Sequence, residues 1–186
     1  MGPPRPYTTG LGNPNPQPQN GSVPAHTHNY HTHQPTNKPT QPTVQVTLIN
    51  NANIRTAVDL WCNDSATAAA TYGDISTWVT SSVKDMSRLF SLSGHCHDAN
   101  FNSDISYWDT SRVVAMNHMF YNARAFNADL SHWDVSRVRT MQLMFHSATS
   151  FNADISKWNV AHVKDLRFMF SGASSFDRDL SEWDLS

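Results

Sequence analysis

Side chains that could bind a metal ion occur in two clusters. The first consists of four histidines near the N-terminus: His26, His28, His31 and His33. The second is His95, Cys96 and His97, which Cys62 could join if the chain folds back on itself. Imidazole and thiolate groups bind zinc, nickel and copper, so both clusters are candidates for metal chemistry.

Neither cluster, however, has the pattern of an established metal site. The four histidines lie in a polar segment with no carboxylate beside them, and ordering such a segment costs conformational entropy. The spacing of the second cluster matches no known zinc motif, which favours a disulfide or free thiols for Cys62 and Cys96. We therefore assign no metal ion and no cofactor, and either thiol state remains open.

Acidic side chains recur at regular spacing in a first column. Its members are Asp74, Asp104, Asp129, Asp154 and Asp179, accompanied by Asn102, Asn127, Asn152 and Asp177. Asp and Asn oxygens accept hydrogen bonds from turn amides, which favours a structural role. The alternative is calcium bridging, because stacked carboxylates repel one another unless a cation neutralises them. A calcium- or zinc-dependent structural element is therefore the second interpretation of the function.

A second column combines acidic residues with neighbours that vary. It contains Asp109, Asp134, Asn159 and Asp184, flanked by Tyr107, His132, Lys157 and Glu182. We expect these side chains to line the exposed face of successive strands. Since the flanking residues differ while the frame is constant, they are candidates for binding a protein or glycan ligand; an ordinary solvated face is the alternative.

Composition excludes several other functions. No Ser, His and acid arrangement, phosphate-binding loop or paired-carboxylate cleft occurs outside the regularly spaced columns, so we predict no enzymatic activity. With 13 basic and 15 acidic residues and no run of Lys or Arg, the sequence does not indicate nucleic-acid binding. It has no apolar run long enough for membrane insertion and no recognisable export signal, so the localisation is left open.

The columns arise from an internal repeat. Phe101, Phe126, Phe151 and Phe176 are spaced by 25 residues, as are Trp108, Trp133, Trp158 and Trp183. An earlier copy is displaced by 30 residues because five extra residues precede Phe101. Such regularity is typical of an array in which each copy packs on the next.

Three segments follow from this pattern. All ten prolines lie between Pro3 and Pro42, in a segment almost without apolar residues, which predicts a disordered arm over 1–45. Apolar residues at helical spacing predict a helical N-terminal cap over 46–72. The repeats occupy 73–186, and the last copy is incomplete, which we interpret as a fragment or an end that needs a partner.

Each copy shows two apolar periodicities in succession. Trp133 and Val135 alternate as on one face of a strand, and the apolar residues from Val138 to Ala148 gather on one side of a helix that Ser136 would cap. We therefore predict an α/β repeat solenoid of about five coils, with short parallel strands and short helices. Its predicted core comprises Trp78, Trp108, Trp133, Trp158 and Trp183 together with Phe120, Phe145 and Phe170.

The repeated pattern F-N-x-D-[IL]-S-x-W-D-x-S-x-V-x-x-M-x-x-M-F-x-x-A is clearest between Phe126 and Ala148. It resembles the BspA-like leucine-rich-repeat surface proteins, also called the mycoplasma-type lipoprotein repeat, over residues 54–186. The resemblance implies a leucine-rich-repeat-like solenoid and a non-catalytic cell-surface or extracellular role in adhesion or protein binding. It implies no catalytic residues.

Overall fold

The computed structural model describes residues 47–185, which belong to one compact unit. Two helices open this part of the chain: α1 (Ile54–Asn63) and α2 (Ser65–Tyr72). Both lie within the range predicted for the helical cap. The predicted arm over 1–45, with its four histidines, lies outside the described residues.

Local sequence explains where these helices begin and end. The buried residues of α1 are Ile54, Ala57 and Val58, whose spacing places them on one side of the helix. Asp64 separates the two helices, and its Oδ1 accepts a hydrogen bond from the Thr67 amide at 3.0 Å, which caps α2. Gly73 ends α2 with a φ of 82°, a conformation that glycine adopts without steric cost.

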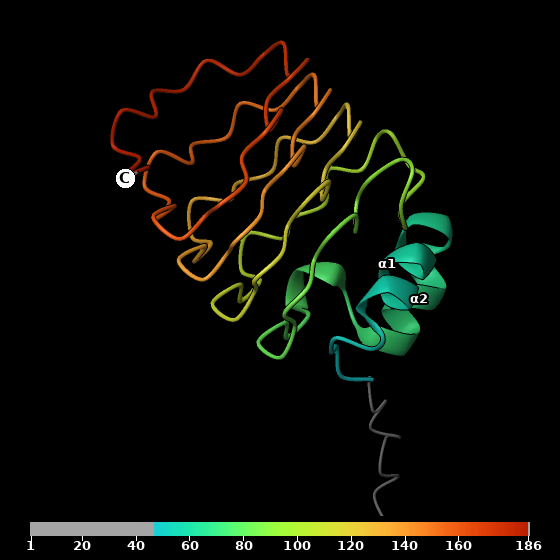
Figure 1. Cartoon of the computed structure of the whole chain (residues 1–186). Helices are drawn as coiled ribbons and strands as arrows, with labels where there is room; N and C mark the ends of the chain where they lie inside the picture. Colours follow the sequence, from blue (N-terminus) through green and yellow to red (C-terminus); the bar gives the residue numbers. More distant parts are fainter. Residues whose placement is uncertain (1–46, 186) are drawn as a thin grey trace, which may run out of the picture. The chain divides into compact units, whose positions relative to one another are not determined.

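Beyond α2 the backbone forms coils that lie side by side (Figure 1). We number each coil from the Asp that begins it: coil 1 is 74–103, coil 2 is 104–128, coil 3 is 129–153, coil 4 is 154–178, and coil 5 begins at 179. Coil 1 opens with a short 3-10 helix, η1 (Ile75–Thr77), in which the Asp74 side chain accepts from the Ser76 amide.

Backbone hydrogen bonds join successive coils from coil 1 to coil 4. The amide of Val114 donates to Lys84 O at 2.8 Å, Arg139 N donates to Val114 O at 2.9 Å, and Lys164 N donates to Arg139 O at 2.8 Å. The residues that follow form isolated parallel bridges, and these are Asp85 with Ala115, Ala115 with Thr140, and Thr140 with Asp165. Equivalent residues of successive coils are therefore held in register.

The prediction of an α/β repeat solenoid with parallel strands and a short helix in each copy is wrong. In residues 47–185 the α-helices are α1 and α2, and β pairing is confined to the isolated bridges. Trp133 and Val135, predicted on a strand, instead belong to turns: Trp133 N donates to Leu130 O at 3.1 Å, and Val138 N donates to Val135 O at 2.9 Å. The alternation of apolar residues there reflects turns that aim side chains inward.

The predicted helix after Ser136 is replaced by consecutive turns. In coil 3, Met144 N donates to Met141 O, three residues back, whereas Leu143 N donates to Arg167 O of coil 4. Leu143 has a φ of 55°, outside the helical region, so the backbone cannot continue as a helix. The equivalent residues Arg88, His118 and Phe168 also have positive φ. Ser136 caps no helix; its amide donates to Asp134 Oδ1 at 2.9 Å.

Aromatic rings fill the interior as stacked columns. Phe90, Phe120, Phe145 and Phe170 stack with centroids 5.5, 5.4 and 5.8 Å apart. Trp78 stacks on Trp108 at 5.9 Å and Trp133 on Trp158 at 6.5 Å. Of the predicted core, Trp78, Trp108, Trp133, Trp158, Phe120 and Phe145 are buried, while Phe170 and Trp183 are half-buried. The interior is thus shared between neighbouring coils.

In this part of the chain no helix is long and apolar enough to cross a membrane.

Candidate functional site

The varying residues of the second column form an exposed row across the coils. Tyr107 and His132 stack with ring centroids 6.1 Å apart, and Lys157 Nζ lies 2.6 Å from Glu182 Oε2. Tyr107 is 79% exposed, which is unusual for a large aromatic side chain. We call Tyr107, His132, Lys157 and Glu182 the variable row. It lies on turns, because no strand forms there.

The polar residues beside the variable row close the turns that follow it in the chain. Asp109 Oδ1 accepts from the Ser111 amide at 3.0 Å and from its hydroxyl at 2.6 Å. In the next coil Asp134 Oδ1 accepts from Ser136 N, and in coil 4 Asn159 Oδ1 accepts from Ala161 N at 3.2 Å. Asp184 is exposed in coil 5. Asp109, Asp134 and Asn159 therefore each use one side-chain oxygen to close a turn.

The first acidic column also accepts from turn amides. Asp74, Asp104, Asp129, Asp154 and Asp179 each accept from the amide two residues later, at 2.8 to 3.0 Å. Hydrogen bonds from Ser131 hold the pKa of Asp129 below its ordinary value, and those from Ser106 do the same for Asp104. The carboxylates of Asp104 and Asp129 are accordingly stabilised in the ionised form by the turns that they close.

The Asn residues of that column connect coils directly. Asn102 Oδ1 accepts from the amide of Asn127 at 2.8 Å, and Asn127 Oδ1 accepts from the amide of Asn152 at 2.7 Å. Asn152 Oδ1 in turn accepts from Asp177 N at 3.1 Å. The ladder supplies an acceptor for one backbone amide in each of coils 2, 3 and 4.

The residues of the second metal candidate are engaged otherwise. Cys62 and Cys96 form a disulfide that ties α1 to the loop inserted in coil 1. His95 Nδ1 lies 3.4 Å from Asp59 Oδ2, and His97 Nδ1 lies 2.8 Å from Leu92 O. Over residues 47–185, no three His, Cys, Asp or Glu side chains are placed so that they could hold a metal ion.

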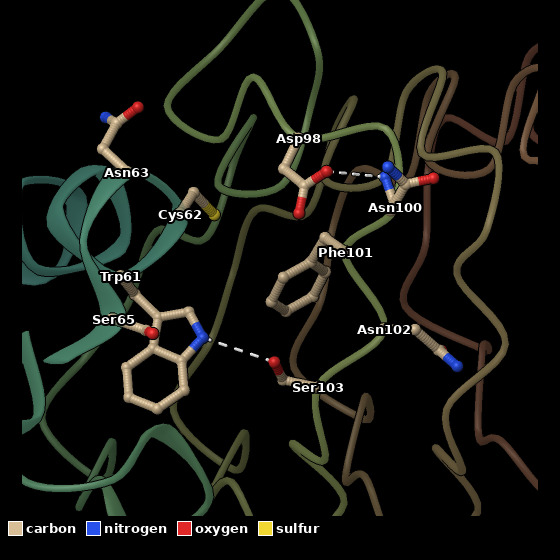
Figure 2. Close-up of a pocket in the computed structure, with 9 residues that line it drawn as sticks. All are labelled: Trp61, Cys62, Asn63, Ser65, Asp98, Asn100, Phe101, Asn102 and Ser103. Atoms are coloured by element: carbon tan, nitrogen blue, oxygen red, sulfur yellow. Dashed lines mark hydrogen bonds between the residues drawn. The ribbon is translucent and has the colours of Figure 1, made fainter.

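A groove of about 490 Å³ lies where the cap meets coil 1 (Figure 2). One wall comes from the end of α1 and the start of α2, and the other from the segment after the inserted loop. It is lined by Trp61, Cys62, Asn63, Ser65, Asp98, Asn100, Phe101, Asn102 and Ser103. The indole Nε1 of Trp61 donates across it to Ser103 Oγ at 3.3 Å. The groove offers amide and hydroxyl groups for hydrogen bonding; Asp98 is its one ionisable lining side chain.

A surface on which basic side chains gather was not identified from the sequence. We call Lys84, Arg112, Arg137, Arg139, His162 and Lys164, with Val114 among them, the basic face. Arg137, Arg139, His162, Val114 and Ser136 line a depression of about 480 Å³. These basic residues do not form a run along the chain, but alignment of the copies, with the 30-residue offset of coil 1, brings them into two columns. That alignment, applied to basic as well as acidic residues, is the signal that could have found them.

Comparisons with known proteins give one match. No curated protein and no solved structure matches the chain significantly. A family model described as "Mycoplasma protein of unknown function, DUF285" matches residues 91–186, from the end of coil 1 through coil 5. Because this match covers just over half of the 186 residues, the chain belongs to the DUF285 family.

Proposed function

We propose that the chain is a non-catalytic module that binds another protein through the variable row, in an adhesion or recognition role at the cell surface. The observation that carries this proposal is the placement of four chemically different, exposed side chains at one position of successive coils. Tyr107 supplies an aromatic surface, His132 an imidazole, and Lys157 and Glu182 opposite charges.

Two physical arguments support a binding role for this row. An exposed tyrosine buries a large area at low entropic cost when a partner covers it, which is why tyrosine is enriched in binding sites. In addition, hydrogen bonds to Asp104 and Asp129 close the turns that carry Tyr107 and His132, so these side chains are displayed from an ordered backbone. A preordered surface loses less entropy on binding.

The disulfide between Cys62 and Cys96 supports an extracellular setting, because disulfides persist mainly in oxidising compartments. The resemblance to BspA-like surface proteins points the same way. Both observations favour the cell-surface interpretation over an intracellular one.

A display experiment tests the binding role. A random peptide library would be selected against the full chain, and the enriched peptides titrated against a Tyr107→Ala/His132→Ala variant. We expect the double variant to lose at least tenfold in affinity, about 1.4 kcal/mol. The matched control is Arg124→Ala, an exposed residue of coil 2 outside the row. Peptides that bind all three proteins equally would overturn the proposal.

A further inference from the structure

The basic face is organised by the hydrogen bonds between coils. Lys84, Val114, Arg139 and Lys164 follow one another along the backbone ladder, each amide donating to the carbonyl of the preceding member. Arg112, Arg137 and His162 lie two residues earlier in coils 2, 3 and 4, beyond the inward-facing Val113, Val138 and Val163. Members of both columns, Val114 and Arg139 of one and Arg137 and His162 of the other, line a single depression, so the two columns lie on the same side of the coils.

The five Lys and Arg side chains of this face are available to a ligand. They and His162 are exposed, and none of the six takes part in the ion pairs found within residues 47–185. Carboxylates next to the columns have other partners: Asp85 pairs with Arg55, and Asp165 pairs with Arg167, each at 2.8 Å. Asp134 lies close enough to this face to be affected by its charge. Hydrogen bonds from Ser136 are the main cause that lowers the pKa of Asp134, and the positive charge of Arg137 lowers it further.

The spacing of the cations follows the spacing of the coils. Equivalent ring centroids of coils 2 and 3 are 5.4 Å apart at Phe120 and Phe145, and those of coils 3 and 4 are 6.5 Å apart at Trp133 and Trp158. Each of coils 1 to 4 contributes at least one Lys or Arg to this face, so the positive charges are distributed along the direction in which the coils stack. Such an arrangement attracts a linear polymer with recurring negative charges more strongly than it attracts a single anion.

We propose that the basic face binds an acidic polysaccharide, a sulfated or carboxylated glycan chain that runs across coils 1 to 4. The depression lined by Arg137 and Arg139 receives one anionic group, and the hydroxyl oxygen of Ser136, which also lines it, accepts from a sugar hydroxyl. A surface on which Lys and Arg gather attracts polyanions in general, and heparin is one of them.

The composition of the face favours a polysaccharide over other polyanions. Single-stranded nucleic acid is usually held by aromatic side chains that stack on bases, and the residues of the basic face include none apart from the imidazole of His162. Val114, 39% exposed, is its one apolar member, which offers little area for an apolar peptide side chain. A surface of guanidinium, ammonium and hydroxyl groups matches the chemistry of an anionic sugar.

The test measures binding of the full chain to a heparin oligosaccharide by calorimetry at several salt concentrations. We expect affinity to fall as salt rises, because exposed charge pairs are screened. Arg137→Ala/Arg139→Ala should weaken binding about tenfold or more, while Arg137→Lys/Arg139→Lys, which keeps both charges, should retain most of the affinity. Thermal melts of each variant would establish that it is folded.

Controls separate this site from the variable row. Arg124→Gln removes an exposed cation of coil 2 outside the basic face and should leave heparin binding within about twofold. Tyr107→Ala/His132→Ala should also bind heparin normally, so the two proposals can fail independently. Equal losses from Arg124→Gln and the double alanine variant would overturn the site. Tighter binding of polyglutamate or single-stranded DNA than of heparin would overturn the assignment to a glycan.

Discussion

The indole Nε1 of Trp133 donates a hydrogen bond to the carbonyl oxygen of Ile105 across 3.1 Å and thereby joins coil 3 to coil 2. The same bond recurs from Trp108 to Ile75, from Trp158 to Leu130 and from Trp183 to Ile155, at 2.9 to 3.1 Å. Each tryptophan therefore does two things: its ring packs in the interior, and its one donor satisfies a carbonyl of the preceding coil.

Replacing this donor should destabilise the fold without removing the aromatic ring. We expect Trp133→Phe to cost about 1 to 3 kcal/mol, because the Ile105 carbonyl loses its partner in a buried setting. Trp133→Ala should cost more, about 3 to 5 kcal/mol, because it also creates a cavity. Denaturation in urea measures both. The matched control is Trp183→Phe, which should cost less since Trp183 is only half-buried. A Trp133→Phe protein as stable as the wild type would contradict this account.

Substitutions at Asn127, one of the Asn residues that connect neighbouring coils, should show whether the acceptor oxygen or the absence of charge matters. Asn127→Ala removes the oxygen that accepts from Asn152 N at 2.7 Å, and we expect a loss of about 0.5 to 1.5 kcal/mol. Asn127→Asp keeps an acceptor oxygen, as Asp177 does at the same position of coil 4, so its loss should be smaller. Equal losses for the two variants in urea denaturation would show that the acceptor is not what matters.

Acid should weaken the fold over a defined range of pH. The side chain and amide of Arg167 lower the pKa of Asp165 from 3.8 to about 2, and the pKa values of Asp104, Asp129 and Asp154 are also lowered. A carboxyl with a lowered pKa in the folded state contributes stability that is complete above the unfolded pKa, near 3.8, and is lost as pH falls toward about 2. The urea midpoint should therefore drop across this range.

One substitution checks the origin of this acid sensitivity. Asp129→Asn should keep the turn, since Asn159 performs the same kind of turn closure beside the variable row, but it removes one titrating group. We expect the variant to lose less stability than the wild type between pH 3.8 and about 2. An unchanged pH dependence would mean that other groups govern the effect.

The disulfide should contribute more than any single hydrogen bond described above. Cys62 and Cys96 are 34 residues apart, and bridging a loop of that size contributes about 2 to 4 kcal/mol by restricting the unfolded chain. We expect Cys62→Ser/Cys96→Ser to lower the free energy of unfolding by this amount and to make the inserted loop the first site of limited proteolysis. Wild-type protein treated with dithiothreitol should behave like the variant. An unchanged urea midpoint in both would contradict the prediction.

The sequence predicted which residues form columns but not the backbone that carries them. The 25-residue spacing anticipated that Phe120 and Phe145 come together, because any fold that stacks the copies aligns equivalent residues. It did not anticipate that Leu143 adopts a positive φ. Apolar spacings of three and four residues satisfy both a helix and a series of turns, and nothing in a leucine indicates the left-handed conformation.

For the candidate site, too, the sequence predicted which side chains lie side by side but not the backbone geometry around them. The exposed position of Tyr107 next to His132 follows from register alone, whereas the role of Asp134 in closing a turn depends on local geometry. The basic face escaped notice because charge was judged along the chain, where Arg137 and Lys164 are far apart. Charge patterning in a repeat protein has to be evaluated across equivalent positions of the copies.

The hydrogen bonds between coils in residues 74–185 all join immediate neighbours. Duplication of one 25-residue unit could therefore add a coil that makes equivalent bonds, since the backbone hydrogen bonds from Met116, His118 and Phe120 to coil 3 recur one repeat later between coils 3 and 4. Each added unit would supply one more side chain to the variable row and up to two more basic side chains. The number of contacts with a polymeric ligand could therefore increase one coil at a time, while the existing contacts keep their geometry.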